Sequence, residues 1–171
     1  VCRQSFSGVF DEQCPMSKID GFDAKILEII QKSNRATSDQ IAEQVCLSPA
    51  AVQRRIKKMR ENNVISSEIA VVNPKAVDRN VMAIVQVTME REQLHLLDEF
   101  KKTAKNHPAV QQCYYVTGSA DFVLVVTAHD MDEYEDFTRE VFFENNNVKG
   151  FQTSIVMDDV KVGLSVPVIV D

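Results

Sequence analysis

The order of predicted elements in the second half of the chain constrains the fold more than any other feature. Between residues 79 and 161, a strand, an amphipathic helix and a strand follow one another, and the same order then repeats. The helices are predicted over residues 91–106 and 131–145, where apolar side chains recur at helical spacing. The predicted buried positions in these helices are Leu96, Leu97, Phe100, Ala104, Tyr134, Phe137 and Val141.

This βαββαβ order is the ferredoxin-like pattern, in which an antiparallel sheet carries both helices on one face. The opposite face has no helix of its own. We therefore expect another copy of the chain to cover it, which predicts an obligate dimer.

Three short helices are predicted earlier in the chain. Asp20, Thr37 and Ser48 are placed to cap their N-termini, and Asn62 and Asn63 are suitable stops because Asn tolerates the left-handed conformation. Only three or four residues separate the second helix from the third, which is typical of a helix-turn-helix. The predicted buried positions are Phe22, Ile26, Ile29, Ile30, Ile41, Val45, Val52, Ile56 and Met59. The whole chain is therefore predicted to be α+β.

Charge is divided unevenly along the 171 residues, whose net charge is -6. Residues 16–66 contain nine basic and six acidic side chains, whereas residues 67–171 contain nine basic and seventeen acidic ones. We predict an extension outside the fold over residues 1–15, a DNA-binding domain over 16–66, a connector strand over 67–78 and a second domain over 79–171. The acidic total does not exclude nucleic acid as a partner, because the local field decides that interaction.

The third predicted helix carries the basic charge. Residues 48–65 read SPAAVQRRIKKMRENNVI, with five positive side chains and one negative one. A solvated, salt-bridged helix face is the alternative, but Glu61 is the only acidic partner within the run. We predict instead a recognition helix for the major groove of double-stranded DNA. The predicted DNA-binding residues are Ser38, Ser48, Ala50, Gln53, Arg54, Arg55, Lys57 and Lys58.

These residues differ in their predicted roles. Gln53 and Arg54 have the donor geometry for base edges, while Lys57 and Lys58 suit phosphates. Arg55 lies nearer the apolar flank of the helix, so a structural role and a phosphate contact both stay open.

No catalytic, metal or cofactor site is predicted. The chain has no phosphate-binding glycine loop and no nucleophile elbow, and His95, His107 and His129 lie far apart. Its four cysteines form no CxxC pair, which indicates reduced thiols and a cytoplasmic location. No apolar run is long enough to span a membrane.

Several stretches together resemble one family, the leucine-responsive regulatory protein/AsnC (Lrp/AsnC) or feast/famine regulators. The resemblance extends from Ile19 to about Lys161, and the matching stretches are IDGFDAKILEIIQ, IAEQVCLSPAAVQRRIKKMRENNVI, the Asn73-Pro74 pair, VTGSADFVL and IVMDDVK. It implies a winged-type helix-turn-helix followed by a domain called RAM. It also implies dimers that often form tetramers or octamers, and control of transcription, here of amino acid metabolism, by an amino acid effector.

The resemblance places the effector near the loop at residues 116–122, between dimers. From the residues alone, an ordinary turn and a binding loop both stay open, because Gly118 permits a positive φ in either. The predicted effector-binding residues are Thr117, Gly118, Ser119, Asp121, Met131 and Val156. Asp121 would face the ammonium, while Met131 and Val156 would line the other end for an apolar effector such as leucine or methionine. Family members commonly carry an acid where Ser119 stands, which predicts weaker binding here.

Two other functions stay open at this point. Sirohaem decarboxylases are similar to this family in both domains, but they should not need a solvent-facing basic helix. A non-specific architectural or metabolite-binding protein is the other alternative, and the sequence separates it only weakly from a regulator.

Overall fold

The computed structural model describes residues 19–170, and the predicted extension over residues 1–15 lies outside them. The described chain divides into two compact units. A helical unit reaches to Ala70 and includes the C-terminal segment from Gly163, and a sheet unit spans Val71–Val162. No helix of the described chain combines the length and the apolar character needed to cross a membrane.

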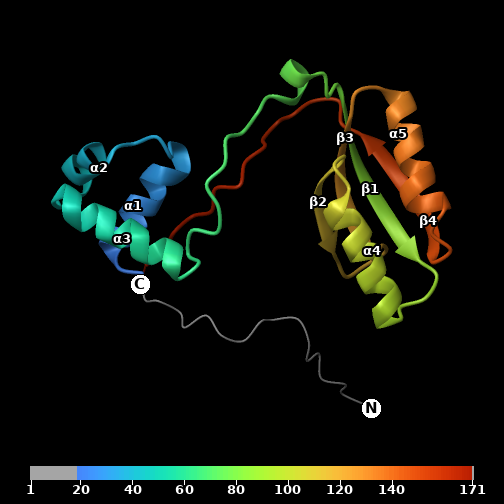
Figure 1. Cartoon of the computed structure of the whole chain (residues 1–171), viewed down its shortest axis with the longest axis horizontal. Helices are drawn as coiled ribbons and strands as arrows, with labels where there is room; N and C mark the ends of the chain where they lie inside the picture. The colour runs from blue at the N-terminus through green and yellow to red at the C-terminus, as the bar shows by residue number, and fades with distance from the viewer. Residues whose placement is uncertain (1–18, 171) are drawn as a thin grey trace, which may run out of the picture. The chain divides into compact units, whose positions relative to one another are not determined.

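The helical unit begins with α1 (Gly21–Lys32), whose N-terminus is closed by two acidic side chains (Figure 1). The Asp20 carboxylate accepts hydrogen bonds from the backbone N–H groups of Phe22 and Asp23, both at 2.9 Å. The Asp23 carboxylate in turn accepts from the backbone N–H of Asp20. This reciprocal capping box satisfies amides that the first helical turn leaves without partners.

The next two helices form the predicted helix-turn-helix. Thr37 and Gln40 form a capping box at the start of α2 (Ser38–Val45). Ser48 caps α3 (Pro49–Glu61), with its Oγ accepting from the backbone N–H of Ala51 at 3.2 Å. The turn before α3 passes through Cys46, which has a φ of 55°.

The three helices share one buried cluster. Its members are Ile26, Leu27, Ile41, Ala42, Val45, Val52 and Met59, each 7% exposed or less. The predicted burial of Phe22 is wrong, because its side chain is 43% exposed. Leu27 takes the inward position instead, since it lies beside Ile26 on the face that α1 turns toward the other helices.

The sheet unit contains four antiparallel strands in the order β2-β3-β1-β4. Their bounds are β1 (Val81–Met89), β2 (Val110–Tyr115), β3 (Phe122–Ala128) and β4 (Val148–Ile155). Helix α4 (Leu94–Asn106) connects β1 to β2, and α5 (Met131–Thr138) connects β3 to β4 through a π-helical segment, η2 (Arg139–Phe143). The predicted ferredoxin-like order is confirmed (Figure 1).

One face of the sheet is covered by helices. Alternate β1 residues Ala83, Val85 and Val87 are fully buried, and they share a core with Phe100 of α4 and Phe137 of α5. The residues between them point to the opposite face. One of these, Ile84, stands directly opposite Val125 of β3 in the strand pairing.

The connector between the two units differs from the prediction. Residues 66–73 contain no strand, and the segment then forms a short 3-10 turn, η1 (Pro74–Val77). The alternating apolar residues of the connector fit an extended chain, but a strand also requires a neighbouring ladder of hydrogen bonds. The single described chain provides no such neighbour for residues 66–73.

Candidate nucleic-acid interface and effector loop

Helix α3 divides into an inward and an outward face. Val52 and Met59 are buried at 0% and 3% exposure and hold the helix against α1 and α2. The outward face consists of exposed residues that were predicted to bind DNA, namely Ala50, Gln53, Arg54, Lys57 and Lys58. The helix therefore presents polar and basic side chains to solvent along its length.

Most of this positive charge has no acidic partner. Lys57 Nζ lies 3.8 Å from Glu61 Oε1, an exposed contact of the i,i+4 type that contributes only about 0.3–0.5 kcal/mol. Within residues 19–170, no ion pair involves Arg54 or Lys58. The outward face of α3 is thus available to an anionic partner.

Arg55 belongs to the interior of the helical unit. Its Nη1 lies 2.8 Å from carboxylate oxygens of both Asp20 and Asp23, and its guanidinium carbon lies 5.5 Å from the centre of the Phe22 ring. The side chain is only 27% exposed. Of the two roles that the sequence leaves open, these contacts support the structural one, which joins α3 to the N-terminus of α1.

The Asp20 carboxylate is stabilised in its charged form. The pKa of Asp20 is lowered, first because the backbone N–H of Asp23 donates to its carboxylate and then because Arg55 pairs with it. A bidentate pair of Arg60 with Glu68, at 2.9 and 2.8 Å, ties the end of α3 to the connector in a similar way. Sequence reasoning missed both pairs, since each joins residues of different elements.

Ser38 and Ser48, the two serines predicted to bind DNA, lie at helix N-termini. Ser48 is exposed and caps α3, and Ser38 is the partly buried first residue of α2. Helix N-termini present unpaired N–H groups and a partial positive charge, which suit a phosphate. These positions fit contacts with a DNA backbone, whereas Gln53 and Arg54 lie further along α3.

The loop between β2 and β3 contains the predicted effector residues Thr117, Gly118 and Ser119, which are all exposed. Gly118 has a φ of 136°, a backbone conformation that other residues rarely adopt, so the turn requires glycine. The loop therefore presents a fixed backbone conformation to solvent rather than a set of buried side chains.

Asp121 has a structural role within this loop. Its Oδ2 accepts a hydrogen bond from the backbone N–H of Met89 at 2.7 Å, where a register shift between Thr88 and Met89 interrupts the pairing of β1 with β4. Its own backbone N–H donates to the carbonyl of Val87 at 2.9 Å. One oxygen of the carboxylate thus fixes the end of β1, while the other accepts no hydrogen bond from the described residues.

The structure separates the two predicted apolar effector residues from the loop. Phe122, next to the loop, pairs with Val87, whereas Ala128 at the other end of β3 pairs with Val81. Met131 follows Ala128, and Val156 donates its backbone N–H to the carbonyl of Met82. Both therefore lie about 20 Å from the loop, given the rise of roughly 3.3 Å per strand residue. Within one chain these two residues do not lie beside the loop, and their place in a site between dimers stays a prediction.

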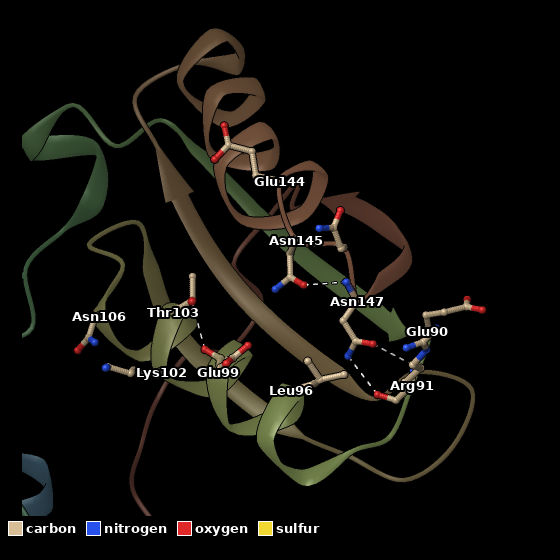
Figure 2. Close-up of a pocket in the computed structure, with 11 residues that line it drawn as sticks. Glu90, Arg91, Leu96, Glu99, Lys102, Thr103, Asn106, Glu144, Asn145 and Asn147 are labelled. Atoms are coloured by element: carbon tan, nitrogen blue, oxygen red, sulfur yellow. Dashed lines mark hydrogen bonds between the residues drawn. The ribbon is translucent and has the colours of Figure 1, made fainter.

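A separate groove opens beside α4 (Figure 2), and none of the predicted effector residues lines it. Asn147, only 7% exposed, binds the backbone of Arg91 at one end of the groove: it accepts from the N–H at 3.1 Å and donates to the carbonyl at 3.0 Å. The oxygen and the nitrogen of the Asn147 side-chain amide therefore both stabilise the turn after β1. The exposed lining residues carry charges of both signs, among them Glu90, Glu99, Lys102 and Glu144.

The described residues contain no cluster of three or more potential metal ligands. Two of the three histidines lie beside a carboxylate: His129 pairs with Asp130 at 2.9 Å, and His107 Nε2 lies 3.6 Å from Glu140.

Comparison with known proteins identifies this combination of domains. An uncharacterized HTH-type transcriptional regulator of Sinorhizobium fredii is 49% identical over 151 residues, which cover 88% of this chain and 89% of that protein. Residues 19–66 match the family model for winged helix-turn-helix DNA-binding, and residues 82–166 match that of the Lrp/AsnC ligand binding domain. The chain belongs to the Lrp/AsnC family.

Other relatives agree with this assignment. The leucine-responsive regulatory protein of Escherichia coli is 26% identical over 86% of this chain and 90% of its own length. A crystal structure of a transcriptional regulator from Neisseria meningitidis in complex with L-Met superposes with a TM-score of 0.81 at 27% identity, covering 86% of this chain and 96% of that one.

This Lrp/AsnC protein is a transcriptional regulator with a DNA-binding helix-turn-helix and a ligand-binding domain. The curated relatives are named as regulators, which sets aside the sirohaem decarboxylase alternative and agrees with the prediction that the chain is not an enzyme.

Proposed function

We propose that this Lrp/AsnC protein recognises specific operator DNA through the outward face of α3 and that a small amino acid tunes this binding. The observation that carries the proposal is the positive charge of Arg54 and Lys58, which form no ion pair within residues 19–170 and lie on an exposed helix of an otherwise acidic protein. Gln53 and Arg54 read base edges, while Lys57 and Lys58 contact phosphates. Ser38 and Ser48 position the unit on the DNA backbone through the helix N-termini.

The protein acts as a dimer in this proposal, formed through the uncovered sheet face. Ile84 is 40% exposed although it lies in the central part of β1, and its neighbours on the same face include Val123 and Val125 of β3. Apolar side chains at the centre of an open sheet face favour association with an identical face through a two-fold axis. A dimer then presents two α3 helices to two operator half-sites, and larger assemblies are built from such dimers.

The proposed effector is a medium-sized apolar amino acid, bound at the loop that contains Thr117, Gly118 and Ser119. Two features support this: the loop exposes backbone groups at Gly118, and a relative of similar fold was crystallised with L-Met. Because Oδ2 of Asp121 accepts from the Met89 N–H, the carboxylate is held in place, and its second oxygen pairs with the effector ammonium in this proposal. The apolar end of the site then requires residues of another subunit, because Met131 and Val156 of the same chain lie far away.

Isothermal titration calorimetry against the twenty amino acids tests the effector. We expect leucine or methionine to bind in the micromolar-to-millimolar range, and Ser119→Asp to tighten that binding about 10- to 100-fold by adding a charge-assisted hydrogen bond. Ser67→Asp is the matched control, since it introduces the same charge at an exposed serine of the other unit.

Asp121→Ala is a poor test of the effector site, because it also removes the hydrogen bond to Met89. If an amino acid binds with the same affinity in the wild-type protein, in Ser119→Asp and in a Thr117→Ala variant, the effector site is not at this loop.

A further inference from the structure

The last residues of the chain lie within the helical unit and not with the sheet that precedes them. Residues from Gly163 onward group with the helices, although β4 of the sheet unit ends only a few residues earlier, at Ile155. The chain thus passes between the two units twice, once after Ala70 and once after Val162. Figure 1 shows the red segment that follows the sheet unit reaching the helical unit near α1 and α3.

A single side chain on α1 holds this segment by its backbone. Gln31 Nε2 donates to the carbonyl of Val166 at 3.1 Å, and Gln31 Oε1 accepts from the Val166 N–H at 2.7 Å. A carboxamide places a donor and an acceptor side by side, as a peptide group does. Gln31 therefore pairs with Val166 in the way that a neighbouring strand would, and neither Glu nor Lys could make both bonds.

The residue that follows Val166 favours the extended backbone that this contact requires. Pro167 fixes its own φ and restricts Val166 to extended conformations, so little backbone freedom is lost when the segment docks. Two residues beyond Val166, the partly buried side chain of Val168 packs against the core of the helical unit, whose fully buried members include Ile26 and Val52. The segment thus adds both an apolar contact and a pair of hydrogen bonds to the domain.

We propose that residues 163–170 form a strap that is an integral part of the DNA-binding domain. The strap makes the stability of α1 depend on a segment that emerges from the ligand-binding domain, in addition to the connector before β1. A conformational change at the end of β4 can therefore be transmitted to the DNA-binding domain through the segment that joins β4 to the strap.

Amide hydrogen exchange on the full-length protein tests this strap without using DNA or an effector, so its outcome is independent of the proposed function. We expect the Val166 amide to be protected in the wild-type protein. Gln31→Leu should remove that protection, and it should also speed exchange in the last turn of α1 roughly tenfold, because two hydrogen bonds are lost. Leu is at least as good a helix former as Gln, so the change does not weaken α1 itself.

Two further proteins complete the test. A chain that ends at Val162 should show the same loss of protection in α1 while β1 keeps its protection. Gln44→Leu is the matched control, because Gln44 lies on α2 and its side chain donates to the carbonyl of Gln40 in the same helix. An unprotected Val166 amide in the wild-type protein, or unchanged exchange of α1 in the shortened chain, would overturn the proposal.

Discussion

Replacing Arg54 and Lys57 together by alanine is expected to abolish operator binding while the protein stays folded and dimeric. Both side chains are exposed on the outward face of α3, and among the described residues Lys57 has one weak acidic partner, Glu61, whereas Arg54 forms no ion pair. Losing a base contact costs about 1–3 kcal/mol, and a dimer loses two, so the affinity should fall about 30-fold to 10⁴-fold. Each lost phosphate contact should also reduce the salt slope of log K by about 0.9.

Arg55 provides a sharp control for this experiment, because it is adjacent in sequence but points inward. Arg55→Met keeps much of the side-chain volume and removes the ion pairs with Asp20 and Asp23. We expect it to lower the thermal stability of the helical unit, whereas Arg54→Ala should leave that stability unchanged. Fluorescence anisotropy with labelled DNA over a range of salt, together with thermal unfolding, separates the two effects. If the Arg54/Lys57 variant binds as tightly as the wild type, α3 is not the recognition helix.

Ile84→Asp is expected to convert the protein into monomers at micromolar concentration. The side chain lies opposite Val125 at the centre of the uncovered sheet face, so a two-fold interface contains it twice. Losing roughly 2 kcal/mol of apolar burial in each subunit raises the dissociation constant of the dimer about a thousandfold, and burying a carboxylate adds to this. Analytical ultracentrifugation measures the result directly.

The control for this change is Leu94→Asp. Leu94 is 77% exposed at the start of α4, on the opposite side of the sheet, so the same type of substitution should leave the dimer intact. An acid in the first turn of a helix is also favourable to the helix dipole. A dimer that survives Ile84→Asp would mean that the subunits meet through another surface.

The parts of the fold that depend on local signals could be predicted from the sequence. Capping boxes at Asp20 and Thr37 and the stop at Asn63, where φ is 55°, involve neighbours three or four residues apart. Likewise, the alternation of buried residues in β1 and the helical spacing in α4 follow directly from the periods of a strand and a helix.

What could not be predicted depends on contacts between distant segments. The separation of Met131 and Val156 from the effector loop within one chain depends on the pairing of the strands, which puts these residues at the other end of the sheet. The structural role of Arg55 cannot be predicted from the sequence, because it depends on an ion pair with Asp23 of α1, 32 positions earlier in the chain. The pairing of Gln31 with Val166 joins residues that are 135 positions apart, for which no local pattern exists.

The most direct test of the central claim is footprinting of the wild-type protein on the DNA upstream of its own gene, with and without a panel of amino acids. We expect protected stretches spaced by about one helical turn, roughly 34–36 Å, as for the two recognition helices of a dimer. Leucine or methionine should change the extent of this protection. Uniform, salt-sensitive coating of any DNA, with no preferred site and no response to an amino acid, would contradict operator recognition and favour an architectural protein.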